Sequence, residues 1–394
     1  MQDVAVVIGA SAESVFAINR AKMRGLKVAA FDGDSKAAGL KIADFSFVCD
    51  IKDPKNIIEI LKQNCLNPLF VLPVPIGRFL ITTGAINEYF KIKNTDDFNT
   101  LNLCTDKLAF HNALNGGGVR ELFRIKIGVM KQNLRDINCE IITKNFTPKE
   151  FPLIIKPRFG SGSRDVMTCF NKDEFDKILS EIDVFKEDFL AETLVFGTEI
   201  GVDGVVIDGV FKSVLMREKI ITPYPFRQCV ANVAINEVLT VSKHIQKAVA
   251  ILGIKNSLLN ADVIIKDDGS VFIIELAPRP SGHYLSSVFM PLVTGVSLVD
   301  EWLNFMQNLP FDFTPKFYKQ ALIKYFDFDF KIDEFMRLKD EFKIVKYECN
   351  NSQNLGEVKD GKSIMNRGFA VILGSDKNEC IKRANELIKT LKKA

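Results

Sequence analysis

Apolar residues in the first part of the chain form short continuous runs separated by helical patterns. A run of valine and isoleucine ends at Gly9, a helical pattern follows, and a second run ends at Asp32. Apolar runs at 45–48 and 69–73, with a helical pattern between them, extend the alternation. Such alternation is typical of a parallel sheet covered by helices. We therefore expect an α/β domain that ends near residue 105.

From Phe151 onward the pattern changes to strands joined by short turns, which predicts a mainly antiparallel body. A helical pattern at 297–306 is followed by Pro310 and then by a last segment of α+β character. The closing helix of that segment, near 376–392, has a single apolar stripe. The expected strands of both parts lie at 153–156, 165–170, 199–206, 210–216, 321–326 and 369–373.

Two acidic residues lie on an expected hairpin within 260–284. Asp262 and Glu275 are on apolar runs joined by Asp268-Gly269, a dipeptide typical of two-residue turns. A turn centred there pairs the two acids on one face. Opposed carboxylates repel unless a cation lies between them, and Mg²⁺ is commonly held by one or two carboxylates plus phosphates. This predicts a metal-phosphate site. The alternative is a solvated hairpin whose one-residue bulge sends the acids to opposite faces.

A loop rich in glycine and serine follows the strand that ends at Lys156. Its small residues at 160–163 allow backbone N–H groups to surround phosphate oxygens. It has no Gly-Lys-Ser/Thr ending and no helix directly after it, so it is not a Walker A loop. A glycine flap between two strands fits this pattern, and an ordinary hairpin loop is the alternative.

Two further features concern nucleotides. Glu192 and Glu199 flank a short apolar connection, where a base could stack while the acids accept hydrogen bonds from ribose hydroxyls or an exocyclic amine. The Gly9-Ala10-Ser11 turn with Asp32 suggests a dinucleotide site, but it lacks the second and third glycines of that fingerprint. A structural turn is therefore the better interpretation of residues 9–11.

The three later features, in this order, resemble the ATP-grasp superfamily, which includes carboxylate–amine ligases and biotin-carboxylase-like enzymes. In that superfamily a nucleotide lies between two α+β lobes, after a Rossmann-like domain that usually binds no dinucleotide. The resemblance covers essentially the whole chain. It implies a Rossmann-like domain at 1–105, a small lobe with the flap at 106–190, a large lobe with the metal site at 191–310, and a C-terminal α+β segment at 311–394.

The resemblance implies roles for the matched residues. Lys107, in Thr-Asp-Lys, corresponds to the lysine that reaches the ATP phosphates, and Lys156 to the strand lysine beneath the flap. Glu192 corresponds to the hinge acid near the adenine, and Glu199, seven residues later, to the ribose-binding acid. The remaining implied ATP contacts are Thr193 and Val195 at the adenine edge, and Gly160, Ser161, Gly162 and Ser163 in the flap.

The hairpin departs from the family pattern at one position. Family members usually end it Glu-x-Asn-Pro-Arg, whereas this chain has Ala277 in place of the asparagine that is a further metal ligand. Asp262 and Glu275 are thus the implied protein ligands of Mg²⁺ or Mn²⁺, which leaves the number of metal ions open. Phosphate oxygens and water can complete an octahedron.

The resemblance implies an enzyme that phosphorylates a small carboxylate, such as an amino acid, to an acyl phosphate, which an amine then attacks. Arg279 is the expected catalytic residue, because a guanidinium fork matches the oxygens of an acyl phosphate. Substrate choice is expected to rest on 217–232, interpreted as a polar connection between strand and helix, and on 281–287. The candidate substrate residues are Arg217, Arg227, Ser281, Gly282 and His283.

Two alternatives remain open. The sequence APRPSGHY at 277–284 also resembles that of ATP-dependent enzymes that carboxylate aminoimidazole ribonucleotide through carboxyphosphate, although their glycine-rich N-terminal signature is absent from 4–16. A nucleotide-binding protein without turnover is the second alternative, and the missing metal asparagine motivates it.

Composition excludes some partners. Lysine and arginine number 52 against 49 aspartate and glutamate, which gives no basic field for nucleic acid. Apolar runs are too short or too interrupted by charge to span a bilayer, and the 8 cysteines contain no Cys-x-x-Cys pair, which is typical of buried thiols in a reducing compartment. We therefore expect a cytoplasmic protein with small-molecule partners, and a homodimer as the commonest symmetric assembly.

Overall fold

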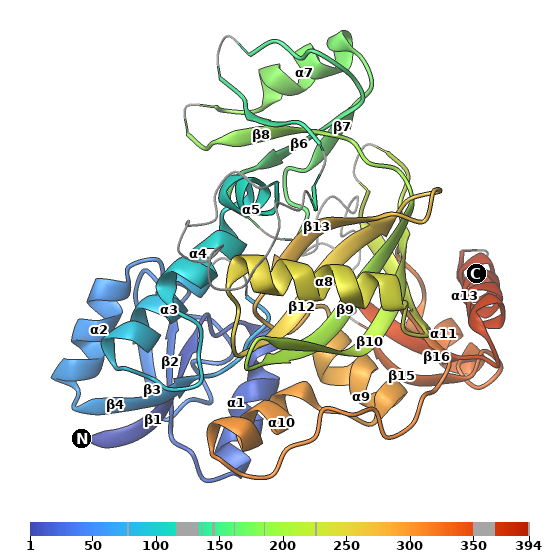
Figure 1. Cartoon of the computed structure of the whole chain (residues 1–394). Helices are drawn as coiled ribbons and strands as arrows, with labels where there is room; N and C mark the ends of the chain where they lie inside the picture. The colour runs from blue at the N-terminus through green and yellow to red at the C-terminus, as the bar shows by residue number, and fades with distance from the viewer. Residues whose placement is uncertain are drawn as a thin grey trace.

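The chain folds into three sheets arranged as a body with a smaller lobe above it (Figure 1). The computed structural model describes residues 1–76, 79–115, 134–135, 137–143, 146–160, 162–184, 186–224, 227–349 and 367–392. Among these residues no helix is long and apolar enough to cross a membrane.

The N-terminal domain is a four-stranded parallel sheet in the order β3-β2-β1-β4, as the alternating pattern predicts. Its β1 is buried on both faces because helices cover the sheet, and its apolar residues divide between two cores. The strands are β1 (Gln2–Ile8), β2 (Val28–Asp32), β3 (Phe45–Val48) and β4 (Leu66–Val71). The helices are η1 (Ala12–Ser14), α1 (Val15–Met23), α2 (Pro54–Gln63), α3 (Leu80–Tyr89) and α4 (Phe98–Thr105).

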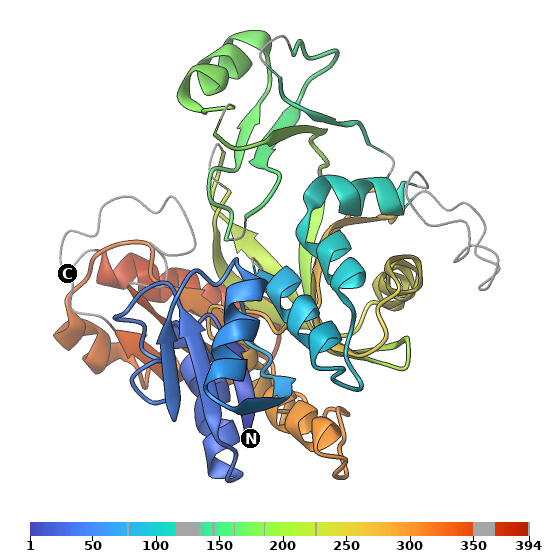
Figure 2. The ribbon, with the colours of Figure 1, turned by 90° about the vertical axis from the view of Figure 1, so that its left-hand side faces the viewer.

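The small lobe is a four-stranded antiparallel sheet, in the order β5-β8-β6-β7, with one helix packed on it. In both ribbon views it stands apart from the body (Figures 1 and 2). Its elements are β5 (Cys139–Ile141), β6 (Leu153–Pro157), β7 (Met167–Cys169), α7 (Lys172–Glu181) and β8 (Phe189–Thr193).

An eight-stranded antiparallel sheet forms the centre of the molecule, in the order β13-β12-β9-β10-β11-β14-β16-β15. Neighbouring residues along β9 and β12 enter different cores, so the sheet is buried on both faces. Its strands are β9 (Thr198–Ile207), β10 (Val210–Ile221), β11 (Cys229–Ile235), β12 (Ser257–Ile265), β13 (Val271–Ala277), β14 (Ala321–Tyr325), β15 (Ile344–Cys349) and β16 (Gly368–Leu373).

Helices cover this sheet on both sides. α5 and α8 share one core with it, η3, α9 and α10 lie in the opposite core, and α11 and α13 pack at the C-terminal end. Their bounds are α5 (Lys107–Leu114), α8 (Leu239–Leu252), η3 (Leu285–Phe289), α9 (Met290–Thr294), α10 (Leu298–Met306), α11 (Ile332–Leu338) and α13 (Lys377–Leu391).

The structure differs from the expected division of the chain at two points. The expected boundary at 310/311 falls within one continuous sheet, because β14 pairs with β11 and leads on to β16 and β15. The expected start of the small lobe at residue 106 falls at α5, which packs against α8 of the central sheet. The spacing of apolar residues predicts single helices and strands. It does not predict which strands pair or which helices pack together, so it does not fix the domain boundaries.

The interpretation of 217–232 as a loop between strand and helix is wrong. β10 continues to Ile221 and β11 begins at Cys229, so most of this segment is an antiparallel hairpin. Arg217 and Lys219 line the candidate site, whereas Glu218 between them pairs with Lys377, so this part of the strand carries three consecutive charged residues and looked irregular in the sequence. Residues 225–226 of the connection lie outside the described part of the chain.

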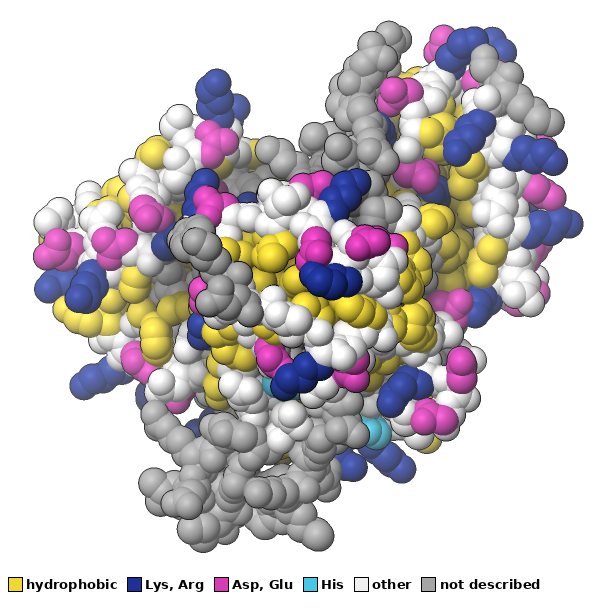
Figure 3. All heavy atoms as spheres, turned by 90° about the horizontal axis from the view of Figure 1, so that it is seen from above, with side chains coloured by type: hydrophobic (Ala, Val, Ile, Leu, Met, Phe, Trp, Pro, Cys, Tyr) yellow, Lys and Arg dark blue, Asp and Glu magenta, His cyan; other side chains and the backbone are white. Residues whose placement is uncertain are grey.

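Polar contacts attach the N-terminal domain to the central sheet. Arg20 Nε and a terminal nitrogen of Arg24 both lie 2.6 Å from Asp300 Oδ1 on α10. Asp96 Oδ1 accepts hydrogen bonds from the backbone N–H groups of Lys255 and Asn256, at 2.7 and 3.3 Å. The face of the molecule seen from above, including the small lobe, has positive and negative side chains interspersed (Figure 3).

Candidate active site

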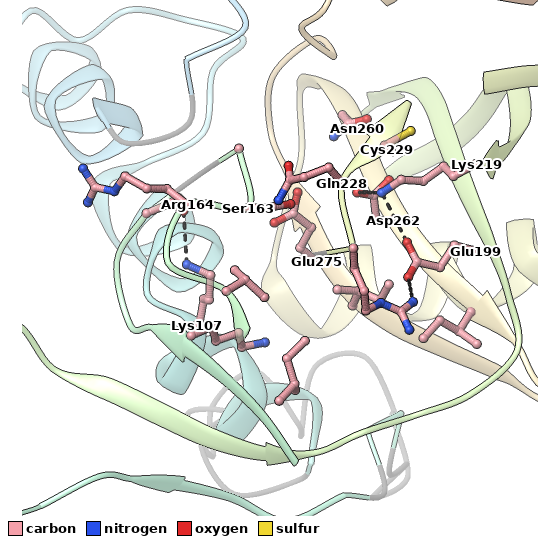
Figure 4. A pocket seen from close by; sticks show the side chains of 18 of the residues that line it. Lys107, Ser163, Arg164, Glu199, Lys219, Gln228, Cys229, Asn260, Asp262 and Glu275 are labelled. Atoms are coloured by element: carbon pink, nitrogen blue, oxygen red, sulfur yellow. Dashed lines mark hydrogen bonds and ion pairs between the residues drawn. The ribbon is translucent and has the colours of Figure 1, made fainter. Parts of the chain in front are cut away.

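A cavity of about 260 Å³ lies between the small lobe and the central sheet. All of the predicted site residues that the structure describes line this cavity; Ser161 alone lies outside the described residues. The shared lining residues are Lys107, Lys156, Gly160, Gly162, Ser163, Glu192, Thr193, Val195, Glu199, Arg217, Arg227, Asp262, Glu275, Arg279, Ser281, Gly282 and His283. Figure 4 shows acidic and basic side chains facing each other across it.

Asp262 pairs directly with Glu275 across the hairpin, as predicted, but through a different register. Lys266 N donates to Ser270 O, so the turn has three residues and Gly269, at φ 77°, occupies the left-handed position. That turn alone would pair position 262 with 274. A bulge next to Asp262 shifts the pairing by one residue. The bulge therefore restores the opposed carboxylates instead of separating them.

Lys219 on β10 supplies a cation beside these carboxylates. Its Nζ lies 2.8 Å from Asp262 Oδ2 and 3.5 Å from a carboxylate oxygen of Glu199 (Figure 4). Burial alone would raise the pKa of Asp262, but the Lys219 ammonium and nearby Arg217 outweigh burial and lower it. Asp262 is therefore ionised at neutral pH.

The paired carboxylates fit a divalent cation. Asp262 and Glu275 are adjacent on one face and line the cavity. Among the described residues no third His, Cys, Asp or Glu joins them, so phosphate oxygens and water would have to complete the coordination of an oxygen-preferring metal such as Mg²⁺.

Glu199 is held by a second basic residue. A terminal nitrogen of Arg227 donates to Glu199 Oε1, and its other terminal nitrogen donates to the Tyr224 hydroxyl at 2.7 Å. The guanidinium also lies over the Tyr224 ring, 5.0 Å from its centroid. Glu199 thus has two cationic neighbours, Arg227 and Lys219, at the edge of the cavity.

Glu192 forms a buried ion-pair cluster on the small lobe. Its Oε2 accepts hydrogen bonds from Lys156 Nζ at 2.6 Å and from Arg135 at 2.9 Å. Burial would raise its pKa, but these two positive charges outweigh that effect and lower the pKa of Glu192 to about 2. β6 and β8 pair with Ile154 opposite Glu192, which brings Lys156 and Glu192 into reach. The backbone N–H of neighbouring Thr193 donates to Asn138 O at 3.1 Å.

Lys107 reaches the flap from the start of α5. Its Nζ donates to Pro157 O at 3.0 Å and to Gly160 O at 3.1 Å. Burial and the nearby Lys156 charge lower its pKa to about 8. Gly160 has φ 153° and Gly162 has φ 70°, conformations that favour glycine and orient the flap backbone.

Asp106 and Arg158 determine where α5 begins. Asp106 caps the helix by accepting hydrogen bonds from Leu108 N and Ala109 N, at 3.0 and 3.3 Å. Arg158 donates to both oxygens of the same carboxylate, at 2.8 and 2.6 Å. Asp106 thereby links the helix that carries Lys107 to the small lobe.

Arg217 is buried and engaged with protein acceptors. Its three guanidinium nitrogens donate to Asp203, Asn232 and Asn260, at 3.0, 2.9 and 3.0 Å. A Cβ at Gly201 would stand 1.9 Å from one of these nitrogens, so only glycine leaves room for the guanidinium. These contacts give Arg217 a structural function in orienting Asn260 beside Asp262, whichever substrate binds.

Two donors at the end of β13 lack partners. Arg279 Nε and Ser281 Oγ are buried and form no hydrogen bond with any described residue. A buried donor left unpaired costs about 1–3 kcal/mol, so such a pair indicates an acceptor that binds there. The terminal nitrogen of Arg279 donates to Pro280 O at 2.9 Å. His283 and Gly282 continue the same loop along the cavity.

Sequence reasoning missed Lys219 and Arg135. Lys219 lies two positions after Arg217 on a strand, and this period places both on one face. Had residues 217–221 been assigned to a strand, this two-residue spacing would have pointed to Lys219. Arg135 had no recognisable local pattern.

Asp32 is engaged by the backbone of its own domain. Its two carboxylate oxygens accept hydrogen bonds from Ala10 N at 2.7 Å and Asp34 N at 2.9 Å. A Cβ at Gly9, φ 88°, would stand 2.5 Å from the Ile76 side chain. This supports the interpretation of residues 9–11 as a structural turn.

Comparisons with known proteins concern the domain family and the fold. Residues 149–288 match the model of the ATP-grasp domain. A stretch of 155 residues is 24% identical to the formate-dependent phosphoribosylglycinamide formyltransferase of Prochlorococcus marinus (strain MIT 9515), covering 39% of this chain. The match spans 37% of the length of that curated relative.

Solved structures match over nearly the full chain. The L-amino acid ligase from Bacillus licheniformis is similar with a TM-score of 0.79 at 17% identity, covering 99% of this chain and 97% of that one. Carboxyaminoimidazole ribonucleotide synthase from Aspergillus clavatus, complexed with ATP, has a TM-score of 0.70 at 15% identity, covering 100% and 98%. These likenesses confirm the predicted fold, a parallel N-terminal sheet followed by the antiparallel ATP-grasp lobes.

Proposed function

We propose that this chain, which has the ATP-grasp fold, is an ATP-dependent carboxylate–amine ligase for small molecules. The observation that carries the proposal is the shared cavity. It joins the predicted nucleotide residues of the small lobe, the paired carboxylates Asp262 and Glu275, and the unpartnered donors of Arg279 and Ser281. The likeness to ligases supports the same reaction class.

The lining suits a nucleotide. Apolar side chains on both lobes can contact the two faces of a base, among them Val166, Ile264 and Phe272. Lys107 and Lys156, beneath the flap, supply positive charge for the phosphates. Glu199 at the cavity edge would accept hydrogen bonds from ribose hydroxyls, exchanging contacts with Arg227.

The reaction proceeds in two steps. A carboxylate oxygen of the first substrate attacks the γ-phosphorus of ATP, the bond to ADP breaks, and an acyl phosphate forms. The amine then attacks the acyl carbon, loses a proton, and displaces inorganic phosphate. Catalysis is mainly positioning and charge stabilisation, so no protein nucleophile is required. The three histidines, His111, His244 and His283, are accordingly expected to form no triad with a nucleophile.

Individual residues take defined parts in this scheme. Asp262 and Glu275 would hold a divalent cation, which when bound would neutralise charge on the phosphates. Arg279 and Ser281 would donate to the oxygens of the carboxylate and of the acyl phosphate formed from it. Closure of the flap over the phosphates would exclude water, which would otherwise hydrolyse the acyl phosphate.

The test is release of ADP from ATP with Mg²⁺, using pooled amino acids, other small carboxylates and amines. A signal that requires both a carboxylate and an amine supports the ligase. ADP release with no second substrate would contradict the ligase. No ADP release in any mixture despite measured ATP binding would also contradict it, and that result would favour a nucleotide-binding protein without turnover.

ATP-dependent carboxylation of aminoimidazole ribonucleotide is the second candidate. The APRPSGHY sequence at 277–284 and the likeness to carboxyaminoimidazole ribonucleotide synthases favour it. It predicts ADP release that depends on bicarbonate and this ribonucleotide and on no other pair. Bicarbonate and aminoimidazole ribonucleotide are therefore tested together in a parallel reaction.

Glu275→Gln tests the metal assignment. The amide keeps the size of the side chain but removes one negative charge, so Mg²⁺-dependent ADP release should fall at least about a hundredfold, or roughly 2.7 kcal/mol. The Mn²⁺ affinity measured by electron paramagnetic resonance, with ATP present, should fall as well. Asp267→Asn, at the exposed tip of the same hairpin, is the control and should change neither quantity.

A further inference from the structure

The loop that follows β13 has a backbone that needs support. His283 and Tyr284 have φ values of 55° and 59°, in the left-handed region, although neither is glycine. This conformation costs about 1–2 kcal/mol per residue for side chains with a Cβ. The same loop brings Ser281, Gly282 and His283 to the cavity, so its conformation sets their positions.

Side chains from both ends of the chain hold this loop. Glu13, in η1 of the N-terminal domain, accepts a hydrogen bond from His283 N. The Tyr325 hydroxyl, on β14, donates to His283 O at 2.8 Å. The Tyr284 hydroxyl donates to Glu348 on β15, also at 2.8 Å. The peptide groups around His283 are therefore fixed on opposite sides by segments far apart in sequence.

Glu13 also packs closely against Gly282. A Cβ at position 282 would stand 2.9 Å from Glu13 Oε1 and 3.1 Å from Oε2. The φ of Gly282 does not itself demand glycine, so a side chain at 282 would be opposed by the Glu13 carboxylate and not by the backbone, and the carboxylate would have to shift to admit it. Glu13 is not among the described residues that line the cavity, and it acts through the loop.

We infer that Glu13 is a positioning residue for the substrate loop 279–284, so that the N-terminal domain takes part in the active site without contacting the nucleotide. The carboxylate holds the His283 amide and keeps Gly282 in place, which orients the Ser281 hydroxyl and the Arg279 side chain toward the carboxylate substrate. The link to that substrate rests on the proposed ligase function.

Glu13→Ala and Glu13→Gln separate a positioning role from general stability. Glutamine retains an oxygen that can accept from His283 N, whereas alanine does not. In Glu13→Ala, amide hydrogen exchange in a peptide that spans 281–286 should become about tenfold faster, and Glu13→Gln should restore most of the protection. Glu88→Ala is the matched control, because it also removes a carboxylate that accepts from a backbone N–H, that of Phe98.

Kinetics form the second arm. Glu13→Ala should raise the KM of the carboxylate substrate about tenfold and leave the KM of ATP unchanged. Gly282→Ala should have the same effect in the wild-type background, because its methyl group displaces the carboxylate. In the Glu13→Ala background it should add little, since the collision is gone.

The exchange arm needs no substrate, so it tests the positioning role even if the ligase proposal fails. Unchanged exchange at 281–286 in Glu13→Ala would overturn the inference. So would additive effects of Glu13→Ala and Gly282→Ala, or a loss in ATP affinity equal to the loss in substrate affinity. If Glu13→Ala does not fold, Glu13→Gln and Gly282→Ala decide by the same two readouts.

Discussion

Two pairs of oppositely charged residues lie in the cavity lining. Lys156 with Glu192 and Lys219 with Asp262 each have an interatomic distance under 3 Å in buried surroundings. Removing two charges from water is costly. Removing only one residue of a buried ion pair is more destabilising still, because the other charge is left unpaired. Bound phosphates would exchange one set of partners for another, which keeps the positive charges oriented.

Lys156→Ala should reduce the affinity for ATP at least about tenfold, equivalent to 1.4 kcal/mol. Arg135 stays beside Glu192, so the buried carboxylate remains neutralised and the lobe should still fold. Isothermal titration with a non-hydrolysable ATP analogue measures the change. Lys172→Ala, an exposed lysine of the same lobe, is the control, and an unaltered affinity in Lys156→Ala would contradict the assigned role.

Asp96 is expected to make stability depend on pH. Burial raises its pKa in the folded state to about 6, from the ordinary value of 3.8 for an aspartate. A folded pKa above the unfolded one means that the folded state holds the proton more tightly, so stability falls as pH rises from about 4 to 6 and then levels. The shift corresponds to roughly 3 kcal/mol.

Asp96→Asn should remove this dependence. The amide oxygen can still accept from Lys255 N and Asn256 N, so the domain contact should remain. Chemical denaturation at pH 4.5 and pH 7.5 should give a smaller difference in unfolding free energy than wild type does. An equal difference in both proteins would show that other groups cause the dependence.

At the scale of elements, the start of α5 determines where Lys107 lies. The N-cap carboxylate of Asp106 satisfies two backbone donors and binds Arg158 at the same time. The start of α5 is thus connected to the small lobe, because the Asp106 carboxylate accepts hydrogen bonds both from the backbone of α5 and from Arg158 of the small lobe. The sequence Thr-Asp-Lys contains the cap residue directly before the lysine, which is a local signal.

Asp106→Ala should lower the unfolding free energy by about 1–3 kcal/mol, through loss of the cap and of the ion pair. It should also weaken ATP binding, because the first turn of α5, which carries Lys107, is no longer held in position. The matched control is Asp97→Ala, which removes the cap of α4 through its bond from Thr100 N. Asp97→Ala should lower the unfolding free energy but leave the affinity for ATP unchanged. Equal ATP affinity in both variants would contradict the assigned link.

In the hairpin β12–β13 the sequence predicted the correct pair of residues from the wrong turn. Its two acids are opposed as expected, but a three-residue turn and a bulge together produce the pairing. A two-residue turn without a bulge gives the same partner. Local sequence could not distinguish these, because both place the same apolar residues in the core.

At the scale of the whole molecule, both polar and apolar contacts of the described residues attach the N-terminal domain to the body, the apolar ones through Val299 and Leu303 of α10. Asp300 binds Arg20 of α1 and Arg24 just after it, Asp96 accepts from two backbone amides, and Glu13 accepts from the loop after β13. The ribbon views place this domain against the body and away from the small lobe (Figures 1 and 2).

Asp300→Ala should lower the unfolding free energy by about 1–3 kcal/mol, because two arginines lose a partly buried partner. ATP affinity should stay within about twofold, since Asp300 is not among the described residues around the cavity. Denaturant unfolding and ATP titration measure the two quantities. Asp312→Ala, an exposed carboxylate, controls for surface charge. A loss of ATP affinity without loss of stability would contradict this separation.

Sequence alone determined the order of most elements and the acids on the hairpin, because periodicity and turn residues depend on near neighbours. The ATP-grasp fold was implied by the resemblance of its motifs to that superfamily. Tertiary structure decided which partner each charge meets. Lys219 and Asp262 are 43 residues apart, and Glu13 and His283 are 270 apart. Sheet order and domain docking bring such residues together, and neither is encoded in a local pattern. For the same reason Arg217, expected in a loop, proved to be buried within a continuous sheet.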